Sequence, residues 1–243
     1  MSTDHLNEIP MVDGVRLRGI ANTRLDTFVD AAFAFGGTVL LISSGDLPST
    51  YSELIALLKD IPAFTLSFFT MMIFWLSHRT WSRNYGIEDK VTIPFTLLLV
   101  VALLIYIYPL KLMYSTLLSF MSGGFLPAGI QISAPSEGVN MIGFYGLGFA
   151  ILSFTMLGLY YRTYVLRDRL KFNALEVLEA KVGMTIWSTL LATGLLSGSI
   201  ALFTPFKYAV WAGMCYWLLA PGIPFLISRT RKKYKREHKK TST

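Results

Sequence analysis

The sequence predicts an all-α, polytopic membrane protein with six transmembrane helices. Of its 243 residues, 53% are hydrophobic and 15% are charged, whereas a soluble domain carries roughly 25% charged residues. The charged residues are also unevenly spread, because several long windows hold almost none. A helix of about 20 residues without charge suits contact with lipid rather than with water.

Six apolar segments are long enough to cross the hydrocarbon core of a membrane. We expect these spans at residues 26–43, 62–81, 91–110, 139–159, 182–203 and 208–228. An amphipathic stretch at 51–59 precedes the second span, and the third is expected to continue to residue 121. Each span must be helical, since lipid offers no partners for unpaired backbone groups.

The basic residues gather on one side of these spans. Nineteen of the 22 lysines and arginines lie in the first 24 residues, around two of the inter-span loops and in the C-terminal tail. The other side holds Lys59, Lys111 and Lys207. The positive-inside rule therefore predicts that both chain ends are cytoplasmic.

This reading divides the chain into a cytoplasmic N-terminal segment (1–23), a membrane domain (24–228) and a basic tail (229–243). We expect the tail to be disordered and to bind anionic lipid headgroups. The net charge of +7 comes mostly from this tail, so it does not indicate nucleic-acid binding. Residues 122–138 are expected to form an external loop, and 167–180 a charged helical link.

Two further observations concern packing and chemistry. Gly194 and Gly198 match a small-xxx-small pattern, which allows close approach of membrane helices. Cys215 lies in an apolar run and is interpreted as a packing residue. The sequence has three histidines but no HExxH, GxSxG or glycine-rich phosphate loop. We therefore expect no enzyme activity, no cofactor and no metal site.

The start of the first span is polar for a membrane helix. Thr23 and Asp26 match a capping box, and an acid in the first turn suits the helix dipole. Asp30 lies about 6 Å further along the helix. A carboxylate at the bilayer centre costs about 2.5–3.5 kcal/mol, and less near the interface, so Asp30 needs a partner. Arg24 points to another side of the helix, so this partner must come from another helix or subunit.

His78 is the candidate partner of Asp30, because it ends the second span on the same predicted side of the membrane. The alternative is a histidine satisfied at the interface, beside Trp75 and Trp81 of an aromatic belt. The sequence leaves both interpretations open.

Beyond Asp30, a spacing of i, i+3, i+4, i+7 places four residues on one helix face: Phe35, Thr38, Val39 and Ile42. Ordinary helix packing and a pore lining would both produce this pattern. In a pore, rings of bulky apolar side chains gate by dewetting, and a ring of hydroxyls contacts a partly dehydrated ion. Gly36 and Gly37 leave a bare patch where a neighbouring helix can come close.

At the start of this span the sequence reads Arg24-Leu-Asp-Thr-Phe28-Val29-Asp30. It resembles the RxxxFSD signature of the TMEM175 family, the lysosomal and prokaryotic potassium channels. The end of the second span, Phe74-Trp75-Leu76-Ser77-His78-Arg79, looks like the aromatic-tryptophan and serine-histidine ending of that family. Six spans, cytoplasmic termini and Pro109 late in the third span are also similar.

The resemblance implies a homotetramer in a prokaryotic inner membrane, with the first helices of four copies around a central pore. Phe35 would form the hydrophobic constriction, Thr38 the hydroxyl ring linked to potassium preference, and Val39 and Ile42 the rest of the apolar lining. Polar contacts would hold the cytoplasmic end of this helix through Arg24, Phe28, Asp30, Trp75 and His78.

Two residues depart from the family pattern. Val29 replaces the motif serine and loses its hydroxyl, and Phe35 is bulkier than the usual isoleucine or leucine. The sequence also has no TVGYG-like segment, so we expect only a modest preference for potassium over sodium.

The expected function is thus a passive potassium channel. The alternative is a proton-coupled secondary transporter that uses Asp30 and His78, although the paired interrupted spans typical of such transporters are not evident.

Overall fold

The computed structural model describes residues 9–43, 47–204 and 209–241. Six helices in this part of the chain are long and apolar enough to cross a membrane, which confirms the predicted fold class. The elements, in chain order, are β1 (Met11–Val12), β2 (Val15–Arg16), α2 (Arg24–Ile42), α3 (Tyr51–Tyr85), α4 (Thr92–Met121), α5 (Pro135–Val165), α6 (Ala174–Phe203), α7 (Ala209–Met214), the 3-10 turn η2 (Cys215–Leu218) and α8 (Leu219–Thr241).

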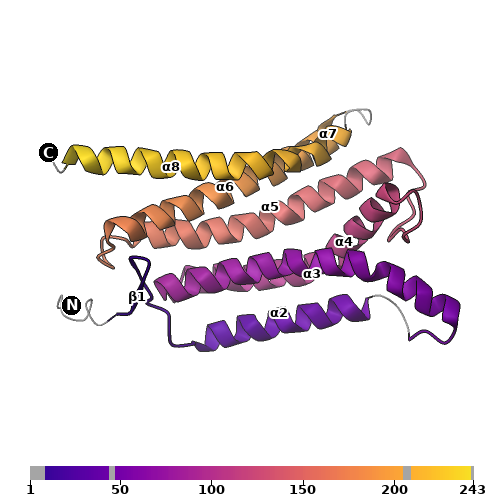
Figure 1. The fold of residues 1–243 in the computed structure, drawn as a ribbon, viewed down its shortest axis with the longest axis horizontal. Coiled ribbons are helices and arrows are strands. Elements are labelled where there is room, and N and C mark those ends of the chain that lie inside the picture. The colour runs from indigo at the N-terminus through magenta and orange to yellow at the C-terminus, as the bar shows by residue number, and fades with distance from the viewer. Residues whose placement is uncertain (1–8, 44–46, 205–208, 242–243) are drawn as a thin grey trace.

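The long helices lie side by side and alternate in direction (Figure 1). The helix α2 forms one edge of the bundle and contacts α3 and α4, whereas α8 forms the opposite edge and contacts α6. The antiparallel pair β1–β2 and the C-terminal part of α8 lie at the same end of the bundle. The core lies between α3, α4 and α5, where Leu99, Leu152 and Met156 are fully buried.

Helix α3 differs from its predicted span because it is one continuous helix from Tyr51 to Tyr85. Its start is fixed by a capping box, in which Thr50 Oγ1 accepts from the Glu53 backbone N–H at 3.3 Å. The amphipathic stretch is therefore the first part of the span itself. Pro62 lies inside the helix and removes one backbone hydrogen bond without ending it.

The predicted helical link at 167–180 is only half correct. Helix α5 ends at Val165, a turn follows, and α6 begins at Ala174. Asn173 caps α6, because its Oδ1 accepts from the backbone N–H groups of Leu175 and Glu176, each at 2.9 Å. An Asn-x-x-Glu capping pattern is readable in the sequence, and it marks the true start of this helix.

The sixth span is interrupted, and the basic tail is not disordered. The chain passes from α7 through η2 into α8, which continues to Thr241. Tyr234 is buried against Leu178 and Val182, and its hydroxyl donates to the Ala174 carbonyl. These contacts attach the first part of the tail to α6. The first residue of the predicted span, at 208, and Lys207 lie outside the described residues.

Helices α5 and α6 approach closely at glycines, as the small-xxx-small pattern predicts. A Cβ atom placed on Gly194 would lie 2.9 Å from the Gly146 carbonyl oxygen, and one on Gly146 would lie 2.8 Å from the Gly198 nitrogen. Both contacts are with backbone, which cannot move aside as a flexible side chain can. The two helices therefore depend on the absence of side chains here.

We expect Gly194→Val to destabilise the protein by about 1–3 kcal/mol, the range typical of an overpacked site. The measurement is the fraction of protein that stays monodisperse in detergent after heating. Leu195→Val is the control, because it places a valine at the next position, where the side chain is exposed. Equal thermal stability of the two variants would contradict the packing argument.

Candidate functional site

Helix α2 begins with the capping box that its sequence predicts. Thr23 Oγ1 accepts a hydrogen bond from the Asp26 backbone N–H at 3.0 Å, and Asp26 Oδ2 accepts one from the Thr23 backbone N–H at 3.2 Å. The Asp26 carboxylate also lies where the helix dipole favours negative charge. The box fixes the first residue of α2, and with it the direction of every later side chain.

Two carboxylates of α2 attach it to α3. Ser82 donates its hydroxyl to Asp26 Oδ1 at 2.6 Å, and the Trp75 indole N–H donates to Asp30 Oδ1 at 2.7 Å. The Arg79 guanidinium lies 5.2 Å from the centroid of the Trp75 ring. Hydrogen bonds to a charged acceptor are roughly twice as strong as neutral ones. The helix is therefore held at two successive turns.

His78 does not pair with Asp30, which corrects that prediction. Its Nε2 lies 3.2 Å from Thr96 Oγ1 of α4, and its side chain is buried. Trp75, His78 and Ser82 stand at neighbouring positions on one side of α3, but the His78 imidazole reaches the Thr96 hydroxyl of α4. His78 still lines a cavity of about 400 Å³ together with Asp30. The sequence thus predicted correctly that His78 lies near Asp30. The hydrogen-bond partner of Asp30, however, is Trp75.

The segment before α2 is also anchored, through a contact that the sequence did not predict. Glu176 of α6 is fully buried and accepts from Arg18 Nη1 at 2.7 Å and from the Arg16 backbone N–H at 3.0 Å. Gly19 packs so closely that a Cβ atom there would lie 2.2 Å from the Ser82 carbonyl oxygen. The N-terminal segment thus ties α2 to the ends of α3 and α6.

A second ion pair lies at the same end of the bundle but away from α2. Arg162 Nη2 of α5 lies 2.6 Å from Asp89 Oδ2, in the loop between α3 and α4. Burial alone would raise the pKa of Asp89, but hydrogen bonds from the Thr92 backbone and from Arg162 outweigh it and hold this pKa below its usual value. The pair joins α5 to the start of α4.

The two sides of α2 differ sharply in burial. Four residues face the rest of the chain and are buried: Val29, Phe33, Gly36 and Leu40. The opposite side carries Phe35, 60% exposed, and Ile42, 70% exposed, with Thr38 exposed between them. Val39 is half-buried at the edge of this exposed stripe. The predicted face is therefore turned away from its own bundle, with Val39 as its least exposed member.

The motif residues at the start of α2 differ in how far they are buried. Val29, where the family has serine, is 1% exposed and belongs to the hydrophobic core. The valine methyl groups therefore pack in the core at the position where serine would place its hydroxyl. Arg24 and Phe28 are exposed in the single chain, so their expected role at the end of this helix stays a prediction.

The glycines of α2 let it pack closely on its neighbours. A Cβ atom on Gly36 would lie 3.3 Å from Met71 Sδ of α3 and 3.4 Å from a methyl carbon of Leu104 of α4. One on Gly37 would lie 3.4 Å from the Phe68 ring. The helices that come close to the predicted bare patch are therefore α3 and α4 of the same chain.

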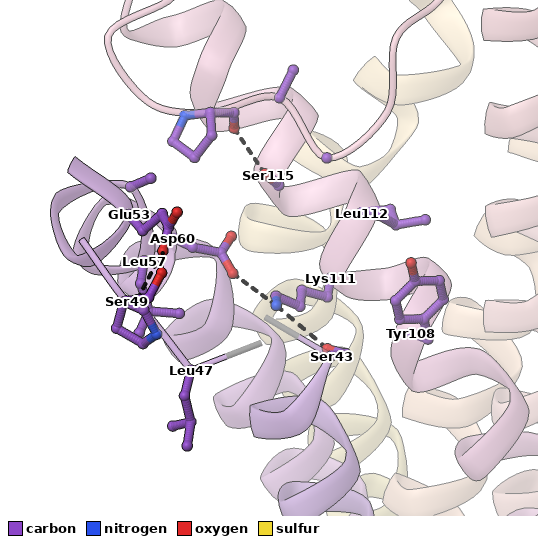
Figure 2. A pocket seen from close by; sticks show the side chains of 15 residues that line it. Ser43, Leu47, Ser49, Glu53, Leu57, Asp60, Tyr108, Lys111, Leu112 and Ser115 are labelled. Atoms are coloured by element: carbon purple, nitrogen blue, oxygen red, sulfur yellow. Dashed lines mark hydrogen bonds and ion pairs between the residues drawn. The ribbon is translucent and has the colours of Figure 1, made fainter. Parts of the chain in front are cut away.

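The far end of α2 is held by an ion pair inside the bundle (Figure 2). Lys111 Nζ of α4 lies 2.7 Å from Asp60 Oδ2 of α3 and donates to Ser43 Oγ, just after α2, at 3.3 Å. Lys111 is 4% exposed. The sequence placed it only as a charge on the external side, because its partners lie on other helices.

Comparison with known proteins finds relatives that are potassium channels. Residues 24–109 match the family model described as endosomal/lysosomal potassium channel TMEM175. A potassium channel from Marivirga tractuosa is 32% identical over 229 residues, which cover 90% of this chain and 92% of the relative. The crystal structure of a variant of the potassium channel MtTMEM175, in complex with a nanobody–MBP fusion protein, matches with a TM-score of 0.80 at 27% identity and covers 93% of this chain and 100% of that one.

The matched segment contains the features that set α2 in place. It begins at Arg24, the first residue of α2, and ends in α4 at Pro109. It therefore includes the attachments of Asp26 and Asp30 to α3. The similarity to the Marivirga protein extends over nearly the whole of both chains. The chain belongs to the TMEM175 family of potassium channels.

Proposed function

We propose that this protein is a passive, potassium-permeable channel in which the α2 helices of four copies surround a central pore. The observation that carries the proposal is the exposed stripe of Phe35, Thr38 and Ile42 on a helix at the edge of the bundle. The rest of the chain does not cover this stripe, so it is available for contact with lipid or with other copies of the chain. A four-fold assembly would bring the four stripes together around its axis.

In this assembly Phe35 would form the constriction. Four phenylalanine rings at one level make a narrow apolar passage, which excludes water and ions when it closes. Val39 and Ile42 would continue the apolar lining toward the outer mouth. Rotation of the four rings away from the axis would widen the path.

Thr38 would supply the polar contact for a passing ion. Its Oγ1 donates to the Ala34 carbonyl at 3.2 Å, so the oxygen lone pairs are left to face outward. Potassium holds its hydration shell less tightly than sodium, so a hydroxyl ring favours it. Without a cage of backbone carbonyls, this preference should be modest.

The direction of α2 also suits cations. Its N-terminus lies at the basic end of the bundle, so its C-terminal carbonyls and the negative end of its dipole would lie at the outer mouth. The proposed orientation has both termini in the cytoplasm of a prokaryotic cell, as the charge distribution of the loops indicates. The helical end of the basic tail would then lie near anionic lipid headgroups.

At the cytoplasmic end we propose a structural network for the pore helix. The Asp30–Trp75 bond and the His78–Thr96 contact would hold α2 and α3 in place. Arg24 and Phe28 would act at the contact between neighbouring copies, because they are exposed in one chain. In this division, residues 24–228 form the channel domain between a cytoplasmic segment (1–23) and the basic tail (229–243).

Membership of a potassium-channel family agrees with the expectation that the protein is not an enzyme and needs no cofactor. The alternative is a proton-coupled transporter, in which Asp30 and His78 would together form the proton-coupled site. Each of these side chains has a different hydrogen-bond partner, on different helices. The geometry therefore favours passive conduction.

Ion flux from proteoliposomes tests the proposal. Purified protein in vesicles with a potassium gradient should release potassium at a rate set by the membrane potential, without a proton gradient. A chemical cross-linking series that ends at four copies should accompany it. Absence of cation flux, or flux that stops when the proton gradient is removed, would overturn the proposal.

Phe35→Ala should raise the basal potassium flux roughly tenfold, which corresponds to a barrier lower by about 1.4 kcal/mol. Removing the ring widens the proposed constriction and admits water. The control is Phe69→Ala on α3, because Phe69 is also 60% exposed but lies outside the stripe. Equal flux for both variants would remove Phe35 from the ion path.

Thr38→Ala should lower the ratio of potassium to sodium permeability toward one, because the ring loses its hydroxyls. Thr38→Ser keeps the hydroxyl and should keep most of the preference. Bi-ionic reversal potentials measure the ratio directly. The assignment fails if serine and alanine change it equally.

A further inference from the structure

The ion pair at the outer end of α2 has no part in the proposed ion path, yet it is buried. Lys111 is 4% exposed, and the Asp60 side chain is 17% exposed. Charged groups within membrane helices are costly, and a buried pair seldom repays its loss of hydration through its own attraction. Stability alone therefore does not explain why charges occupy this position.

Each partner lies two residues from a proline inside its helix. Asp60 precedes Pro62 in α3, and Lys111 follows Pro109 in α4. Each proline removes a backbone hydrogen bond, which weakens the helix locally. The ion pair thus joins α3 and α4 at the places where each can bend most easily.

Ser43 connects this pair to α2. Its Oγ accepts from Lys111 Nζ at 3.3 Å and donates to the Leu40 carbonyl at 2.6 Å, while its backbone N–H donates to the Val39 carbonyl at 3.0 Å. Ile42 is the residue directly before Ser43. Lys111 therefore contacts the residue that directly follows α2, next to the outermost side chain in the exposed stripe.

There is space beside the pair for α2 to move. A cavity of about 600 Å³ is lined by Ser43, Asp60 and Lys111, and by Glu53 and Tyr108 (Figure 2). A helix end in a close-packed core could not shift when one contact is lost. Here the end of α2 borders open volume, so its position depends on the polar contacts that hold it.

We propose that Lys111 and Asp60 are positioning residues for ion conduction, which hold the outer end of each α2 helix in place and so set the pore width at Ile42. This inference rests on the proposed function, in which α2 lines the pore. When the pair is broken, the outer end of α2 moves into the cavity beside α3 and α4, away from the axis of the proposed pore. The four Ile42 side chains then lie further apart, and water and ions enter the outer part of the path more easily.

The first test measures potassium flux for variants of the pair in proteoliposomes. Lys111→Met and Asp60→Asn should each raise the flux roughly three- to tenfold, and the double variant should not exceed the larger single effect, because Lys111→Met already breaks the pair that Asp60→Asn removes. Lys111→Arg keeps the charge and should leave the flux close to that of the parent protein. Additive increases, a loss of flux, or an arginine variant no closer to the parent than methionine would overturn the proposal.

The matched control is Arg162→Met, which breaks the Arg162–Asp89 pair at the other end of the bundle. That pair also joins two parts of the chain but does not touch α2. Its loss should leave the flux and the permeability ratio as in the parent protein, even if thermal stability falls. A similar change of flux in Arg162→Met would show a general effect of ion pairs and would overturn the positioning role.

The second test follows α2 itself by hydrogen–deuterium exchange with mass spectrometry. Lys111→Met should raise exchange in peptides that cover residues 38–43, whereas Arg162→Met should not. Unchanged exchange would overturn the proposal whatever the flux. If Phe35→Ala and Thr38→Ala leave conduction unchanged, the pore assignment fails separately. A changed flux in Lys111→Met would in that case not act through α2, and the positioning role would be overturned as well.

Discussion

The rest of the structure depends on how α2 is fixed in rotation. Asp26 and Asp30 accept hydrogen bonds from Ser82 and Trp75 of one neighbouring helix, at two successive turns of α2. Two attachments along one side of a helix prevent it from turning about its axis. A turn of one residue, about 100°, would expose buried core residues and hide the Phe35 stripe. The polar start of α2 thus decides which residues can face a common axis.

These attachments leave α2 at the edge of the bundle with one face free. The middle of the helix packs through glycines on α3 and α4, and its outer end is held by the Lys111–Asp60 pair through Ser43. Polar contacts therefore hold both ends, while the middle packs through apolar contacts. This division would suit the proposed role of α2, in which the helix keeps its direction while the side chains that line the path change orientation.

The sequence predicted features whose physical signals are local. Apolar length located six spans, the Thr23–Asp26 capping box located the start of α2, and the Gly194–Gly198 spacing located a close helix contact. The sequence did not predict the polar contacts between helices, because they depend on which side of a neighbouring helix lies against the residue. The partner of Asp30 and the burial of Lys111 and Glu176 are of this kind. The helical tail was missed because its apolar residue Tyr234 lies among many charges.

The backbone of α2 limits what a pore of this design can offer an ion. Before the last turn of an α-helix, the carbonyl groups accept hydrogen bonds from residues four positions later, so along the proposed path they cannot replace the water around a passing ion. Side chains must do so, and within the stripe of Phe35, Thr38 and Ile42 only Thr38 carries an oxygen. A single ring of hydroxyls can substitute few water molecules, so its preference for one cation over another is limited. If α2 lines the pore as proposed, the same helical geometry would therefore make the discrimination between potassium and sodium modest.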